Sequence, residues 1–120
     1  MQELRLMLPG FVALRHEDVR TCGIPDLSLT GLNKTTWWEF KYGHPDFSSH
    51  GIQELIMLRL AAAGFARYVL WMEVGNGVET TLIVHPKKLK DLEWEVAIPR
   101  FDHKAVVSYM KAVHERMIRS

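Results

Sequence analysis

The chain has 120 residues, of which 48% are hydrophobic and 24% charged, and its formal net charge is +1. This length and composition predict one globular domain over residues 1–120. A single cysteine, Cys22, excludes an internal disulfide and a cysteine-based zinc site. The balanced charge excludes a uniformly basic nucleic-acid-binding domain, so any DNA-facing surface has to be local.

Targeting signals are absent from the sequence as given. No apolar run approaches the roughly 20 residues of a membrane span. The opening residues, MQELRLMLPGF, lack the basic region, apolar core and cleavage site of a secretory signal. We therefore expect an intracellular, cytoplasmic protein that does not bind a membrane.

The first half of the chain predicts a helix, three strands and a second helix. The second helix starts at Ser48 or Ser49 as N-cap, ends at Ala63 and is followed by a left-handed Gly64. Its apolar residues surround most of its circumference, which predicts burial against a sheet: Ile52, Leu55, Ile56, Leu58 and Leu60. The elements before it are expected at 1–8 (helix), 11–16, 26–30 and 36–42 (strands).

The second half predicts a hairpin, a further strand and a final helix. The hairpin strands, 67–74 and 78–85, flank Gly75-Asn76-Gly77. A helical turn over 87–92, a strand over 94–98 and a helix capped by Asp102 follow. That last helix has one apolar stripe, typical of a core or dimer contact: Val106, Met110, Val113 and Met117. The order predicts an α/β domain with a mixed central β-sheet flanked by helices.

Strand geometry makes the hairpin over residues 26–42 specific. A four-residue turn over 31–34 pairs Thr30 with Thr35 and places Asp26 opposite Glu39. Because side chains alternate, Lys41 joins this acidic face, together with Ser28 and Trp37. The opposite face is apolar and is expected in the core: Leu27, Leu29, Trp38, Phe40 and Tyr42.

Two carboxylates held this close repel each other unless a cation joins them. Mg²⁺ suits such a site because it takes hard oxygen ligands and needs only one or two carboxylates. The backbone carbonyl of Phe40 offers a further oxygen, and Lys41 is placed to position water or a phosphate oxygen. This combination favours metal-dependent phosphodiester hydrolysis. The alternative is that Glu39-Phe40-Lys41 is an ordinary exposed strand with solvated charges.

A resemblance to a known family rests on three parts of the sequence. They are Gly23-Ile24-Pro25-Asp26-Leu27, Trp38-Glu39-Phe40-Lys41 and Gln53, which lies in the predicted helix before Gly64-Phe65. Together they resemble the PD-(D/E)xK nuclease superfamily. More narrowly, they are similar to its VRR-NUC type, found as small stand-alone phage proteins and as a domain of larger repair nucleases. The match covers about the first half of the chain. It implies a restriction-endonuclease-like core (αβββαβ) and a single VRR-NUC-like domain.

The resemblance also implies roles. Asp26 and Glu39 would bind Mg²⁺ or Mn²⁺, Lys41 would be the catalytic lysine, and Gln53 would support the water or a scissile-strand phosphate. Glu3, on the first predicted helix, is the candidate for a further acidic ligand. Stand-alone relatives tend to be homodimers acting on branched DNA. We therefore expect a structure-selective DNA endonuclease that is homodimeric and, like the small stand-alone phage proteins, phage-encoded in a bacterial host. A non-catalytic DNA-binding or assembly protein, and a nuclease for linear duplex DNA, are the alternatives.

Residues outside this constellation have weaker signals. The six histidines lack zinc-ligand spacing, so most are expected at the surface. Gln53 alone is equally a polar residue of an exposed helical turn, and Trp37 either stacks on a base or packs under a neighbouring segment. Some basic side chains are candidates for phosphate contacts, and each of them is alternatively a solvated surface charge. They are Lys34, Arg15, Arg20, His50, Lys87 and Lys88.

Overall fold

The chain folds around a mixed six-stranded sheet with the strand order β1-β2-β3-β4-β5-β6. The computed structural model describes residues 10–16, 25–43, 51–74, 77–100 and 102–119. Neighbouring strands are antiparallel except for the parallel pair β3–β4. The strands are β1 (Val12–Arg15), β2 (Leu27–Gly31), β3 (Lys34–Tyr42), β4 (Ala66–Val74), β5 (Val78–Val84) and β6 (Trp94–Pro99).

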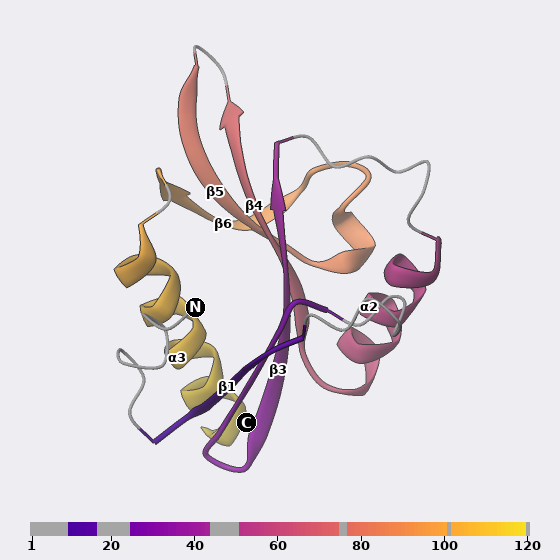
Figure 1. Ribbon diagram of the computed structural model, residues 1–120, viewed down its shortest axis with the longest axis vertical. Coiled ribbons are helices and arrows are strands. Elements are labelled where there is room, and N and C mark those ends of the chain that lie inside the picture. The colour runs from indigo at the N-terminus through magenta and orange to yellow at the C-terminus, as the bar shows by residue number, and fades with distance from the viewer. Residues whose placement is uncertain (1–9, 17–24, 44–50, 75–76, 101, 120) are drawn as a thin grey trace.

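Helices cover both faces of this sheet (Figure 1). α3 (His103–Arg119) packs on one face, whereas α2 (Gly51–Ala63) and the short 3-10 helix η1 (Pro86–Lys88) lie on the other. α2 connects β3 to β4, because two parallel strands need a crossover rather than a tight turn. These layers confirm the predicted α/β class with a mixed central sheet flanked by helices. None of the described helices is long and apolar enough to cross a membrane.

The β2–β3 hairpin has the predicted register. Thr30 pairs with Thr35 and Ser28 with Trp37. The two central turn residues, Leu32 and Asn33, both have positive φ, of 55° and 63°. Two left-handed residues in succession define a type I′ turn, whose twist matches that of the flanking strands. The turn therefore fixes which side chains of β2 and β3 share a face.

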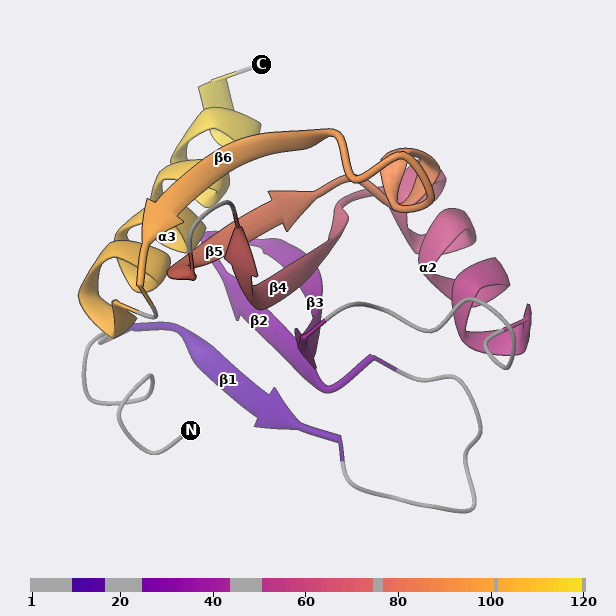
Figure 2. The ribbon, with the colours of Figure 1, turned by 90° about the horizontal axis from the view of Figure 1, so that it is seen from above.

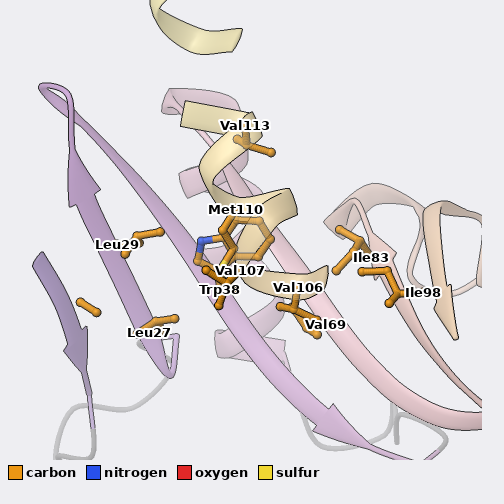
Figure 3. Packing of buried hydrophobic residues seen from close by; sticks show 11 residues of the cluster. Leu27, Leu29, Trp38, Val69, Ile83, Ile98, Val106, Val107, Met110 and Val113 are labelled. Carbon is orange, nitrogen blue, oxygen red and sulfur yellow. The ribbon is translucent and has the colours of Figure 1, made fainter. Parts of the chain in front are cut away.

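The face covered by α3 holds the larger apolar core, shown in Figure 3. Leu27, Leu29 and Trp38 from the hairpin are fully buried there, as predicted. The indole Nε1 of Trp38 donates a 2.8 Å hydrogen bond to Thr36 Oγ1, which satisfies its buried polar group. The other strands and α3 complete the cluster with Ala13, Val69, Ile83, Ile98, Val106, Val107, Met110 and Val113.

The apolar stripe of α3 is a core contact, since Val106, Met110 and Val113 are buried and Met117 packs against the same cluster. Asp102 is the predicted N-cap: its Oδ1 accepts hydrogen bonds from the backbone N of Lys104 and of Ala105, at 3.0 and 3.3 Å.

A second apolar cluster lies between the sheet and α2 with η1. It contains Met57, Ala66, Tyr68, Leu70, Met72, Leu82, Val84 and Leu89. α2 is buried against the sheet, as predicted, but on one side only: Met57 is its fully buried residue, whereas Ile52 is 58% and Leu55 47% exposed. A helix lying on a single sheet face can bury only one side.

Three predictions are corrected. Tyr42 is 78% exposed, since β3 extends there beyond β2, and its ring contacts Trp71 rather than the core. Gly64 ends α2 without a positive φ; its N–H bonds to the carbonyl of Leu60. His114 is fully buried rather than at the surface. The predicted helix over 1–8, the caps Ser48 and Ser49, and the hairpin tip at 75–76 lie outside the described residues.

Candidate active site

Asp26 and Glu39 lie next to each other where β2 begins. Leu27 pairs with Trp38, so the same antiparallel register brings Asp26 opposite Glu39. The backbone N of Asp26 donates to Glu39 Oε1 at 3.0 Å. In turn, the backbone N of Phe40 donates to Asp26 Oδ2, also at 3.0 Å. Each carboxylate is thus held by a main-chain donor of the opposite strand, which fixes the position of both acids.

Gln53 and Lys41 complete the group. Gln53, in the first turn of α2, donates from Nε2 to Glu39 Oε2 at 2.7 Å. Its Oε1 accepts a 2.8 Å hydrogen bond from Lys41 Nζ, and Lys41 Nζ lies 3.4 Å from Glu39 Oε2. The structure therefore brings together all four side chains predicted for catalysis, with Gln53 bridging the acid and the lysine.

Glu39 is the more buried member of the carboxylate pair. Only 3% of its surface is exposed. Burial first, and then the neighbouring charge of Asp26, raise the pKa of Glu39 from 4.5 to about 6, against a lowering by Lys41. The carboxylate is therefore held in a place where it is costly to ionise, which is the situation that a bound cation relieves.

The donor set fits a small hard cation. Two carboxylates sit on one face, and the N–H of Phe40 points towards Asp26. Because a strand residue directs its N–H and C=O towards the same neighbouring strand, the Phe40 carbonyl faces that side as well. Two carboxylates and one carbonyl, with water in the remaining positions, suit Mg²⁺ or Mn²⁺. Within the described part of the chain, no three His, Cys, Asp or Glu side chains gather into a fuller metal cluster.

Two neighbours of the site, Tyr68 and His16, were not anticipated. Tyr68 pairs with Glu39 across the parallel β3–β4 ladder. Burial first, and then the charges of Glu39 and Glu54, raise the pKa of Tyr68 above its usual range, so its hydroxyl is neutral. His16 and Ser28 lie on the other side, where His16 Nε2 is 2.9 Å from Ser28 Oγ. Strand pairing outside the hairpin would have been needed to find Tyr68 and His16.

The predicted phosphate contacts are scattered. Arg15 pairs with Leu27, and Lys34 precedes Thr36 by two residues, so both lie on the α3 face, away from the carboxylates. Lys87 and Lys88 lie in η1, and Lys88 forms a 3.3 Å ion pair with Glu93. Trp37 packs against the second cluster and beside the His16 ring. Glu3, Arg20 and His50 lie outside the described residues.

Comparisons with known proteins find a similarity to a solved structure but no matching family model. No family model matches the chain, and no curated protein matches it either. Among solved structures, the chain is similar to the Holliday junction resolvase Hjc of Archaeoglobus fulgidus, an archaeal hyperthermophile. The identity is 15%, the match covers 88% of this chain and 92% of that one, and the TM-score is 0.48.

Proposed function

We propose that this protein is a metal-dependent deoxyribonuclease with a restriction-endonuclease-like core that hydrolyses phosphodiester bonds. The observation that carries the proposal is the joining of Asp26, Glu39, Lys41 and Gln53 into one hydrogen-bonded group on one face of the sheet. Solvated surface charges, the alternative for this motif, do not explain a glutamate that is buried beside a second carboxylate. Burial of a carboxylate beside a second one is costly, and groups whose pKa is shifted by burial and a neighbouring charge cluster at functional sites.

The roles follow from the contacts. Asp26, Glu39 and the Phe40 carbonyl would hold Mg²⁺ or Mn²⁺. When bound, the ion supplies Lewis-acid activation of water and neutralises charge developing on the phosphate. Lys41 has a side chain that is 20% exposed, so its ammonium group can reach a phosphate oxygen while Gln53 restrains it. Gln53 also orients Glu39 through its amide N–H, which makes it a positioning residue.

We propose further that the substrate is branched DNA, such as a Holliday junction, and that the protein acts as a homodimer. The support for both is the VRR-NUC-like motif set described above. Two active sites in one dimer suit the two strands that must be cut to resolve a four-way junction. Light scattering that gives a mass near 13.9 kDa, the mass of one chain, would exclude the dimer.

The test is a substrate panel. Labelled four-way junction, flap, single-stranded and linear duplex DNA are incubated with the protein and Mg²⁺, Mn²⁺ or a chelator. The proposal expects metal-dependent cleavage, strongest for the junction. Cleavage of linear duplex alone would retain the nuclease and change the substrate, whereas binding without cleavage in any metal would favour the non-catalytic alternative.

A further inference from the structure

A second group of side chains adjoins the carboxylates on the same face of the sheet. The backbone N of His16 donates a 2.7 Å hydrogen bond to the carbonyl of Asp26, so His16 lies opposite Asp26 at the end of the β1–β2 ladder. Its ring centroid is 5.5 Å from that of Trp37, with 30° between the planes. With Ser28 Oγ at 2.9 Å from Nε2, these contacts form the His16 platform, defined as His16, Ser28 and Trp37.

The platform holds the imidazole in one orientation. Ser28 is only 4% exposed. Trp37 packs against the second apolar cluster, and its backbone N bonds to the carbonyl of Phe65 at 3.0 Å. His16 itself is half-buried. A ligand that meets this ring therefore finds a side chain that is already ordered, and little conformational entropy is lost on contact.

The platform also lies on an open part of the sheet. Val12 and Leu14, on the same face of β1, are 55% and 49% exposed. α2 packs on β4 and η1, on the other side of β3, and Figure 2 shows β1 at the sheet edge, away from α2. A DNA strand that reaches Asp26 and Glu39 can thus extend over His16 without displacing either of the described helices α2 and α3.

The chemistry of the ring suits a phosphate. In the part of the chain that the structure describes, Ser28 Oγ is the hydrogen-bond partner of the ring through Nε2. When the Ser28 hydroxyl donates to Nε2, the proton of a neutral imidazole is on Nδ1, which is then a donor. A phosphate oxygen accepts such a hydrogen bond, and contacts of this kind set the position of DNA on a protein.

Resting on the proposed nuclease function, we propose that His16 is a substrate-positioning residue that donates a hydrogen bond from Nδ1 to a DNA phosphate beside the one that is cleaved. In this arrangement the Ser28 hydroxyl donates to Nε2, and the Trp37 ring packs beside the imidazole. The same side of the sheet then holds a cutting site and, next to it, a fixed contact that sets the strand's position.

The test measures DNA binding in an Asp26→Asn background, with a fluorescently labelled four-way junction. His16→Phe keeps a ring against Trp37 and removes both nitrogens, while His16→Asn retains an N–H near the Nδ1 position. His103→Phe, on α3 at the opposite face, is the matched control. We expect His16→Phe to raise Kd on the order of tenfold, the size of one hydrogen bond to a charged group. His16→Asn should recover most of this loss, and His103→Phe should not change Kd.

A second arm identifies the contact. Each phosphate near the cut is replaced in turn by an uncharged methylphosphonate. At one position the replacement should weaken binding of the protein with His16 but not of His16→Phe. Equal affinity of His16→Phe and its parent, or additive effects at every phosphate, would overturn the proposal. A third result would also overturn it. If His16→Phe, in the protein that retains Asp26, loses the Mg²⁺-induced rise in Tm but binds DNA normally, then His16 acts on the metal.

The outcome is separable from that of the nuclease proposal. A wild-type protein that binds the junction through His16 but cuts no DNA in any metal would retain the contact and refute the nuclease. If the wild type cuts DNA, and His16→Phe cuts it equally well with an unchanged Kd, the nuclease proposal is retained and the His16 contact is refuted.

Discussion

Gln53 on α2 donates a 2.7 Å hydrogen bond to Glu39 on β3, and with its other amide atom it accepts one from Lys41. One neutral side chain thus connects the acid that would hold the metal and the cation that would face the phosphate. An amide is suited to this position because it can donate to a carboxylate and accept from an ammonium group at the same time.

Removal of that amide should slow cleavage without preventing folding. In Gln53→Ala, Glu39 and Lys41 lose their common partner, and activity should fall about 10- to 100-fold, as for other residues that orient a metal ligand. Arg59→Ala, on the exposed side of the same helix, is the control and should cut normally. Single-turnover cleavage at saturating metal measures the effect; an unchanged rate in Gln53→Ala would remove Gln53 from the mechanism.

Removal of the Lys41 charge should slow cleavage more than removal of the Gln53 amide does. Lys41→Met keeps the aliphatic stem and removes the charge, and we expect a loss of about 10²- to 10³-fold in cleavage rate. Because metal binding rests on the two carboxylates, the Mg²⁺-induced rise in Tm should remain. A Lys41→Met protein that cuts normally would leave the lysine with a structural role only.

Divalent metal should stabilise the protein through Glu39. At ten times Kd, linkage gives about 1.4 kcal/mol, which corresponds to several degrees in Tm. The pKa of Glu39 is raised from 4.5 to about 6, so below pH 6 protons compete with the ion and the rise in Tm should shrink. Differential scanning fluorimetry at pH 5 and 7.5 measures this. Glu39→Gln is the control, and a metal-induced rise that persists in it would place the ion elsewhere.

His114 should make folding sensitive to acid. Its Nδ1 lies 3.2 Å from the Gly31 carbonyl and its Nε2 3.0 Å from Thr36 Oγ1. Since a carbonyl only accepts, Nδ1 carries the proton and Thr36 donates to Nε2. Burial lowers the pKa of His114 below 6.5. The unfolded chain therefore binds more protons, and the stability contributed by His114 is complete above pH 6.5 and is lost as the pH falls towards the lower folded pKa.

Denaturant unfolding between pH 5 and 8 tests this sign. Glu39 contributes the opposite slope, because its raised pKa favours folding at low pH and that contribution is lost as the pH rises through about 6. His114→Gln retains Glu39, so the difference between the two proteins isolates the histidine. The variant should lose stability less steeply on acidification than the wild type; parallel pH profiles would contradict the buried neutral histidine.

The β2–β3 turn offers a stabilising change. Leu32 adopts a φ of 55° and is 48% exposed, a conformation that costs a branched residue about 1–2 kcal/mol. Replacement of Leu32-Asn33 by Asn-Gly, the preferred type I′ pair, should raise stability by about 1 kcal/mol. Leu55→Asn, which removes a similarly exposed leucine from α2, should give no gain. Thermal unfolding compares the two, and equal effects would mean that exposure rather than backbone strain decides.

Local pattern predicted the parts of the site that lie within one hairpin. Alternation of polar and apolar residues, with a defined turn, was sufficient for the Ser28–Trp37 register and for the buried Trp38. The stripe of α3 likewise identified its core face. In each case a one-residue error would have buried charge, so the sequence itself selects the register.

What the sequence could not provide depends on long-range pairing. The parallel β3–β4 ladder places Tyr68 beside Glu39, and the β1–β2 ladder places His16 beside Asp26. His114 is buried because Thr36 and Gly31, about 80 residues earlier, satisfy both ring nitrogens. α2 is apolar by composition, yet Ile52 and Leu55 are exposed, because only tertiary packing decides which side meets the sheet.

Single-turnover cleavage of a labelled four-way junction by the wild type and by Asp26→Asn, in Mg²⁺, tests the assignment most directly. Asn keeps the shape of Asp26 and one oxygen that can accept from the backbone N of Phe40, but it removes the charge. We predict that the variant binds the junction and cuts it at least about 100-fold more slowly than the wild type. Equal cleavage rates would contradict the assignment of Asp26 and Glu39 as the metal-binding pair.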